Sequence, residues 1–146
     1  MRRNRSEPWL RDLVAENRLA PSDLIWPLFL EDGTDVRRAV PSMPGVHRLS
    51  IERGVEAVAR AGELGIRMVA LFPHVPSESK TADCAEAWNP NNLVCRTVRE
   101  IKRQVPDVGL MCDVALDPYN ALGHDGLVED GRILNGATID ALLRQA

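Results

Sequence analysis

Apolar runs and amphipathic segments alternate along this chain of 146 residues. The runs LIWPLFL (24–30), MVALFPHV (68–75) and VGLMCDVAL (108–116) are each typical of a buried strand. Pro27 weakens the first strand or places a bend in it. Amphipathic helices are predicted between the runs. This order predicts parallel strands with right-handed crossovers, and therefore an α/β fold.

The predicted helices carry recognisable start and stop signals. Their apolar residues recur at helical spacing, as Val94, Val98 and Ile101 do in one of them. The expected N-caps are Ser6, Ser50, Asn91 or Asn92, and Thr138, and the expected stops are Gly65 and Pro106.

Two architectures fit the alternation, an open doubly wound sheet and part of a (β/α)8 barrel. No Gly-rich phosphate loop follows the first strand, which disfavours a nucleotide-binding sheet. The long polar segments 31–49 and 76–90 favour the barrel, whose sites lie on such loops. A barrel needs about 250 residues, so the chain would be roughly half of one. The final LLRQA has no helix stop, and we expect an incomplete chain.

Composition excludes several classes of protein. The net charge of -3 does not indicate a nucleic-acid or membrane partner. No apolar run approaches the roughly 18 residues of a membrane span, and no signal-peptide region follows the basic MRRNR. The three cysteines, Cys84, Cys95 and Cys112, lack CxxC spacing. We therefore expect a reduced, cytoplasmic protein with small buried thiols.

The stretch DVALDPYNALGHDG (113–126) places three aspartates at the end of the third predicted strand. Asp113 lies late in an apolar run, where an unpaired carboxylate is costly, so we expect it to face a partner in the barrel mouth. Asp117 and Asp125, with His124, could hold Mg²⁺ or orient a protonated amine. They are equally ordinary turn formers, and the local residues leave both interpretations open.

Lysine is scarce, with only Lys80 and Lys102 present. Lys102 is expected on the exposed face of a helix near its C-terminus, where the helix dipole favours a cation. Lys80 could reach an anionic group, but a solvated loop lysine is the favoured interpretation. Neither lies on an apolar strand, where a lysine is prepared to form a Schiff base.

The acidic stretch closely resembles the third-strand motif of the porphobilinogen synthase family, also called 5-aminolevulinate dehydratase. The resemblance extends in order along essentially the whole chain. It includes WPLFLEDG, VPSMPGVHRLS, LGIRMVALFP, EAWNPNNLVCRTVREIK and DGRILNGATIDALLRQA. This combination of motifs is highly specific.

The resemblance implies a (β/α)8 barrel preceded by an arm that embraces a neighbouring subunit. We expect residues 1–22 to be part of that arm and 23–146 to be the first part of the barrel. Family members form homo-oligomers, commonly octamers. They condense two molecules of 5-aminolevulinate into porphobilinogen, in the synthesis of tetrapyrroles and haem, using two Schiff-base lysines on later strands.

Residue by residue, Asp113 matches the family's active-site aspartate, with a role at the substrate amine and in proton transfer. Zinc-dependent members carry cysteines at the positions of Ala115, Asp117 and Asp125. Carboxylates do not select zinc, so the resemblance implies the aspartate-rich type. In that type Asp117 and Asp125 bind the substrate amino group, with or without Mg²⁺ or a monovalent ion.

Neither Lys80 nor Lys102 matches a Schiff-base lysine, so the chain alone is expected to be inactive. Two alternatives to an incomplete enzyme stay open. One is a non-catalytic half-barrel that associates with family subunits through exposed strand edges. The other is a small Mg²⁺-binding module built on carboxylates.

Overall fold

The computed structural model describes residues 2–146 and contains a 5-stranded sheet in the order β2-β3-β1-β4-β5. The strands are β1 (Ile25–Glu31), β2 (Arg37–Ala39), β3 (His47–Leu49), β4 (Met68–His74) and β5 (Gly109–Cys112). The three predicted strands are present as β1, β4 and β5, and they pair in parallel in chain order. Pro27 is accommodated inside β1, opposite Ala70 of β4.

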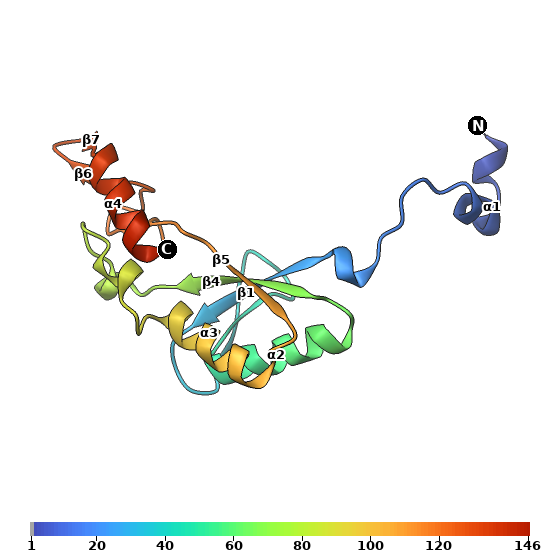
Figure 1. The fold of residues 1–146 in the computed structure, drawn as a ribbon, viewed down its shortest axis with the longest axis horizontal. Helices are drawn as coiled ribbons and strands as arrows, with labels where there is room; N and C mark the ends of the chain where they lie inside the picture. The colour runs from blue at the N-terminus through green and yellow to red at the C-terminus, as the bar shows by residue number, and fades with distance from the viewer. Residues whose placement is uncertain (1) are drawn as a thin grey trace.

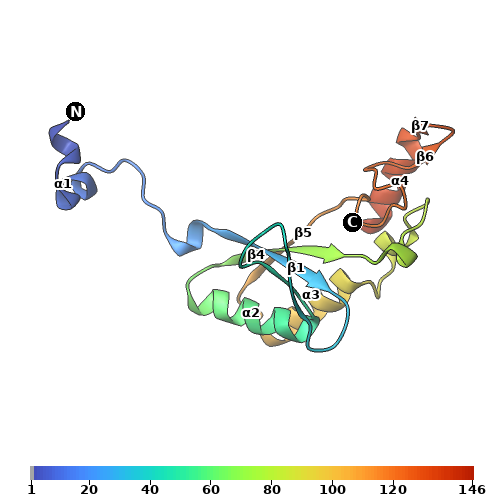
Figure 2. The same ribbon diagram turned by 180° about the vertical axis from the view of Figure 1, so that it is seen from behind.

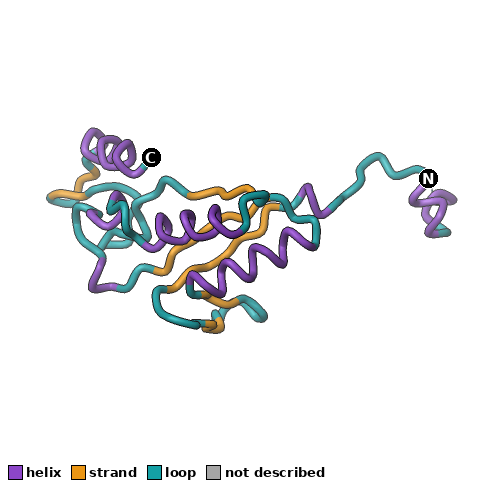
Figure 3. The backbone as a smooth tube through the Cα atoms, turned by 60° about the horizontal axis from the view of Figure 1, so that its bottom comes forward, coloured by secondary structure: helices purple, strands orange, loops and turns teal. Residues whose placement is uncertain are grey.

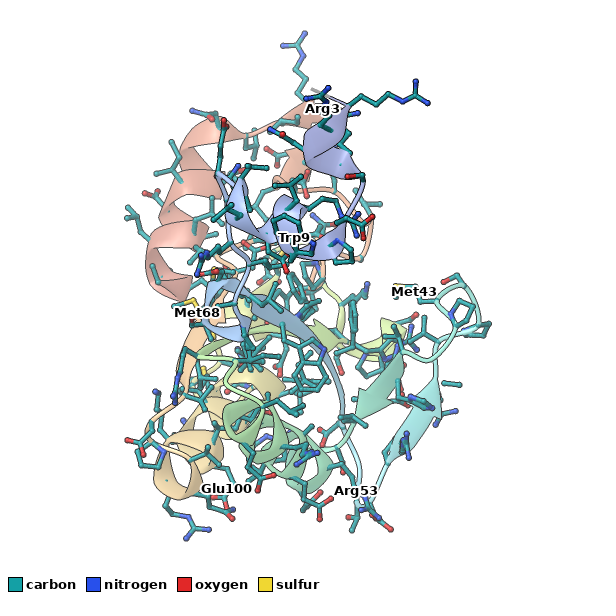
Figure 4. All side chains as sticks on the ribbon, turned by 90° about the vertical axis from the view of Figure 1, so that its right-hand side faces the viewer. Arg3, Trp9, Met43, Arg53, Met68 and Glu100 are labelled. Atoms are coloured by element: carbon teal, nitrogen blue, oxygen red, sulfur yellow. The ribbon has the colours of Figure 1, made fainter. Side chains whose placement is uncertain are left out.

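Two helices, α2 (Ile51–Glu63) and α3 (Leu93–Gln104), lie side by side on one face of this sheet (Figures 1 and 3). Their apolar faces pack on strand residues whose side chains alternate in direction. Figure 4 shows Arg53 of α2 and Glu100 of α3 on this helical side. The fully buried members of the resulting core include Leu30, Val58, Val69, Leu71 and Ile101.

The other face of the sheet carries apolar side chains that the described helices leave open. The rings of Phe29 and Phe72, on paired strands, have centroids 5.8 Å apart. Ile25, Met68 and Met111 are exposed. When strands of this kind close into a barrel, that face becomes the packed interior. Parallel order, outer helices and an apolar inner face are therefore all present as a barrel requires.

The N-terminal residues reach away from the sheet as an extended segment that carries the short helix α1 (Pro8–Leu13) (Figures 1 and 2). The predicted cap at Ser6 is wrong, because Glu7 is the N-cap and the Ser6 hydroxyl donates to the carbonyl of Arg3. Trp9 is 66% exposed, so the apolar stripe of this helix contacts little within the described chain.

The segment predicted as a loop over 31–49 contains the antiparallel pair β2 and β3. Figure 4 shows Met43 at the tip of this hairpin. Strands of three residues carry no visible alternation, so the sequence pattern missed them. β3 then pairs in parallel with the end of β1, through Phe29–Arg48 and Leu30–Leu49.

The boundaries of α2 and α3 agree with their sequence signals. α2 starts after Ser50, although the buried Ser50 hydroxyl accepts from the N–H of Val36 rather than capping the helix. Asn92, rather than Asn91, caps α3, and its side chain accepts from the N–H of Cys95 at 2.8 Å. α3 ends at Gln104, just before Pro106.

The C-terminal region differs more from expectation. β5 ends at Cys112 rather than at residue 116, so Asp113 follows the strand instead of lying within it. A short hairpin of β6 (Val128–Glu129) and β7 (Arg132–Ile133) precedes α4 (Asn135–Gln145). The predicted cap Thr138 lies inside α4, where its hydroxyl donates to the carbonyl of Leu134. None of the described helices is both long and apolar enough to cross a membrane.

Candidate functional site

Two loops that leave the carboxyl ends of β4 and β5 come together at one end of the sheet. The first loop contains two short 3-10 turns, Ser77–Ser79 and Ala85–Trp88. Thr81 of this loop forms a parallel bridge with Asn120 of the second. The N–H of Thr81 donates to the carbonyl of Tyr119, and the N–H of Ala121 donates to the carbonyl of Thr81, both at 3.1 Å.

A second, smaller hydrophobic core contains residues of both loops and of α4. It also holds the start of the 117–126 segment against α4, and the Arg144 guanidinium lies 4.1 Å from the centre of the Trp88 ring. Ring and cation attract in this geometry, which ties α4 to the first loop. The buried members of this core are Cys84, Ala87, Leu116, Tyr119 and Ala141.

Asp113 and Asp117 line the same cavity, which has a volume of about 470 Å³. Its other walls include the end of β4, the start of α3 and the C-terminal end of α4 with Gln145. The expectation that Asp113 faces a partner in the barrel mouth stays a prediction, and its carboxylate is exposed at the cavity wall and not buried unpaired. β5 ends at Cys112, directly before Asp113, and residues 111–114 are exposed.

The three aspartates influence one another through their charges. Partial burial and the negative charges of Asp125 and Asp113 raise the pKa of Asp117, whereas the Lys80 ammonium opposes that rise. Because Asp117 as a residue remains exposed, the neighbouring charges are the more informative cause. Like charges raise a carboxyl pKa only over short distances. Asp113 and Asp117 therefore share one cavity, and Asp125 is linked to them through its charge.

Asp125 contributes to this cluster from outside the 470 Å³ cavity, because it is not among the residues that line it. The neighbouring His124 is turned toward the backbone, and its Nδ1 accepts the N–H of Gly126 at 3.1 Å. That nitrogen is therefore occupied by the loop. The hypothesis that His124 joins the aspartates around a cation gains no support from this geometry.

The two lysines have different surroundings. Lys102 sits near the end of α3, as predicted, and its Nζ donates to the carbonyl of Val108 at 2.8 Å. Lys80 is half-buried rather than fully solvated, and its charge acts on Asp117. The bridge between Thr81 and Asn120 explains this placement, because it brings the Lys80 loop against the acidic loop.

Asp113 and Asp117 offer carboxylate oxygens, and the thiols of Cys95 and Cys112 line the same cavity. Ala115 offers no ligand, and Cys84 is buried in the second core. Oxygen donors suit Mg²⁺ or a monovalent cation and fit zinc poorly. Within residues 2–146, no group of three or more His, Cys, Asp or Glu side chains is arranged to hold a metal ion.

Two site features were missed from the sequence. Asn120 is 1% exposed and bonds to the backbone at both ends of its side chain. Burial, followed by the charges of Cys95 and Glu86, raises the pKa of Tyr119 to about 12. Both residues lie in the motif, but asparagine also occurs in ordinary turns, so nothing local marked Asn120.

A second hollow, of about 560 Å³, lies between the β2–β3 hairpin, β1 and α2. Trp26, Met43 and Arg53 are among its lining residues, and none of the three aspartates contributes to it. The Arg53 guanidinium is already paired with Asp35 and Glu56. We therefore place the candidate site at the aspartates and not at this hollow.

Comparison with known proteins identifies what the chain is similar to. The family model for delta-aminolevulinic acid dehydratase matches residues 1–146. The delta-aminolevulinic acid dehydratase of Bradyrhizobium diazoefficiens is 52% identical over 145 residues, covering 99% of this chain and 41% of the relative. The Rhodobacter capsulatus protein of the same name is 44% identical over 148 residues, covering 100% of this chain and 44% of the relative.

A solved structure is similar over the same range. It is the delta-aminolevulinic acid dehydratase (porphobilinogen synthase) of Toxoplasma gondii ME49, in complex with the reaction product porphobilinogen. The two folds superpose with a TM-score of 0.92 at 44% identity, covering 99% of this chain and 41% of that one. The chain therefore spans well under half the length of the proteins that it matches.

Proposed function

Because this chain belongs to the delta-aminolevulinic acid dehydratase family, and its fold is the N-terminal part of the (β/α)8 barrel, we propose that the complete protein is a porphobilinogen synthase. This lyase condenses two molecules of 5-aminolevulinate into porphobilinogen with loss of water, a step in tetrapyrrole and haem synthesis. The observation that carries the proposal is the family match over residues 1–146, at 52% identity to the Bradyrhizobium protein.

In this proposal the three aspartates form the acidic side of the active site. Asp113 contacts the substrate amine and assists proton transfer. Asp117 and Asp125 hold the amino group, whose positive charge relieves their mutual repulsion. The raised pKa of Asp117 supports this role, because it reflects partial burial and like-charge repulsion, and a bound ammonium group would relieve the repulsion.

The remaining features of the enzyme are also proposals. The carboxylate donors lead us to propose Mg²⁺ or a monovalent ion, rather than zinc, as any activating ion. We propose that the complete protein is a cytoplasmic homo-octamer, in which an N-terminal arm of residues 1–22 embraces a neighbouring subunit. The 66% exposure of Trp9 on that segment supports a role in subunit contact.

A non-catalytic role for residues 1–146 alone is the second candidate. The open apolar face of the sheet, with Met68, Phe72 and Met111 exposed, favours association with another polypeptide. Such a half-barrel would bind family subunits without completing the reaction. A purified chain that stays a folded monomer would count against this candidate.

The decisive experiment is borohydride trapping with 5-aminolevulinate. A Schiff base between a lysine amine and the substrate ketone is reduced to a stable secondary amine, which mass spectrometry locates. We expect no adduct on the chain of 146 residues. We expect an adduct on the chain extended with the remaining sequence of the Bradyrhizobium relative, together with formation of porphobilinogen.

The outcomes separate the two candidates. A folded extended chain that forms neither adduct nor product would refute the enzyme proposal. An adduct on Lys80 or Lys102 of the short chain would contradict the view that its lysines take no part. Lys80→Arg and Lys102→Arg variants, which keep the charge but cannot form the imine under these conditions, are the matched controls.

A further inference from the structure

Asn120 is a buried side chain at the point where the two site loops meet, and the proposed chemistry gives it no role. Its Oδ1 accepts the N–H of Leu122 at 2.7 Å, and its Nδ2 donates to the carbonyl of Gly126 at 3.1 Å. A buried polar group left without partners costs about 1–3 kcal/mol. Asn120 is therefore held in one orientation by both ends of its amide.

These two bonds close the acidic loop on itself. The N–H of Gly123 also donates to the Asn120 carbonyl at 3.0 Å, which completes the turn between them. Asp117 lies shortly before Asn120, and Asp125 lies directly before Gly126. The bond to the Gly126 carbonyl consequently ties the Asp125 end of the loop to the Asp117 end.

Both ends are anchored to other parts of the fold. On one side, the Asn120 backbone is bridged to Thr81 of the loop that follows β4. On the other side, Gly126 packs closely against β7 and α4. A Cβ atom there would lie 2.9 Å from Cγ2 of Ile133 and 3.3 Å from Oγ1 of Thr138. The Asn120 side chain therefore joins two firmly placed segments, and not two freely moving ones.

We propose that Asn120 is a positioning residue that sets the separation between the side chains at 117 and 125. Through this spacing the two carboxylates face the same amine or hard cation. The inference deepens the proposed function and rests on it only for the nature of the bound group. The effect of the Asp125 charge on the Asp117 carboxyl agrees with this spacing.

The spacing is measured with a metal probe in place of the unidentified ion. Ala115→Cys, Asp117→Cys and Asp125→Cys together convert the three positions into thiolates in the chain of 146 residues. Co²⁺ is the probe, because its tetrahedral thiolate complexes absorb visible light and Co²⁺ occupies the same sites as zinc. The unsubstituted chain, with Cys84, Cys95 and Cys112, measures the background.

Asn120→Ala is then added to the three-cysteine chain. Loss of a residue that holds the metal ligands in place costs about 10- to 100-fold in metal affinity. We expect Asn120→Ala to weaken Co²⁺ binding by a factor of that order. The matched control is Thr97→Ala. Thr97 is likewise a buried polar side chain bonded to the backbone, at 0% exposure, but it lies inside α3 and is not among the residues that line the cavity of Asp113 and Asp117. We expect it to leave Co²⁺ affinity unchanged.

Two results would overturn the proposal. One is a three-cysteine chain that binds Co²⁺ no more tightly than the unsubstituted chain. The other is equal Co²⁺ affinity in folded Asn120→Ala and Thr97→Ala variants. If circular dichroism shows that Asn120→Ala unfolds, Asn120→Thr is measured in its place. Unchanged Co²⁺ affinity in the Asn120→Thr variant would also contradict the proposal. The Co²⁺ measurement uses no substrate. It therefore tests the role of Asn120 even if the complete protein does not catalyse the condensation.

Discussion

Gly65 occupies the turn between α2 and β4 in a conformation that other residues adopt at a cost. Its φ is +89°, and it follows the C-terminal end of α2 in a Schellman motif. The N–H of Ile66 donates to the carbonyl of Ala61, and the N–H of Gly65 donates to that of Gly62, both at 3.0 Å. This arrangement satisfies carbonyls that the helix end would otherwise leave open.

Gly65→Ala should therefore lower the free energy of unfolding. The left-handed backbone costs about 1–2 kcal/mol for a residue with a Cβ atom. The new Cβ would also lie 3.2 Å from Cβ of Pro21, at the base of the N-terminal segment, where a contact that close requires a small shift. We expect a loss of about 2 kcal/mol.

Gly54, on the same helix, supplies the matched control. A Cβ atom there would lie 3.6 Å from Cδ2 of Leu30 and 3.7 Å from Cδ2 of Leu28, which are ordinary contacts. Its φ is not among the positive values of the described glycines. Alanine is favoured over glycine inside a helix by about 1 kcal/mol, so Gly54→Ala should stabilise the chain by about that amount.

Urea unfolding followed by circular dichroism measures both variants against the unsubstituted chain. The two identical substitutions should move the unfolding midpoint in opposite directions, with unchanged slope. If Gly65→Ala matched the original stability, the strain argument would fail. If Gly54→Ala cost more than about 1 kcal/mol, the packing of α2 on β1 would be tighter than the structure shows.

Two further predictions concern titrating groups. Tyr119 is the single tyrosine, so its ultraviolet absorbance should show ionisation near pH 12 in the folded chain and near pH 10 in urea. Its raised pKa contributes stability below about pH 10 that is lost as the pH rises toward 12, and an ordinary midpoint would contradict its burial. Lys80→Met should raise the pKa of Asp117 further, and Asp125→Asn should lower it, as followed by carboxyl NMR. Because the Asp117 pKa is raised on folding, the chain gains stability as the pH falls through it, and Lys80→Met should strengthen that gain.

The sequence predicted the main elements because their signals are local. Continuous apolar runs identified β1, β4 and β5, and helical spacing identified α2 and α3. Gly65 and Asn92 act where they were expected, since a helix end depends on a few neighbouring residues. The family resemblance, which the match over residues 1–146 confirms, supplied the barrel and the identity of the acidic motif.

The local pattern failed where contacts are distant in the chain. Ser50 starts α2 as expected, but its hydroxyl bonds to Val36, and the pattern of 31–49 did not reveal the β2–β3 hairpin. Those strands exist because the edge of β1 offers backbone partners to β3. Thr138 has the character of a cap, yet it bonds to Leu134 and Leu127 within a packed corner.

The sequence by itself determined which carboxylates this protein has and that they follow a strand. Only the tertiary structure decided that Asp117 lies within the influence of Asp113, Asp125 and Lys80. Residue chemistry is a local property, whereas the distance between loops depends on the bridge from Thr81 to Asn120 and on the core beneath it. The electrostatics of the site therefore arise from packing between segments that are far apart in the chain.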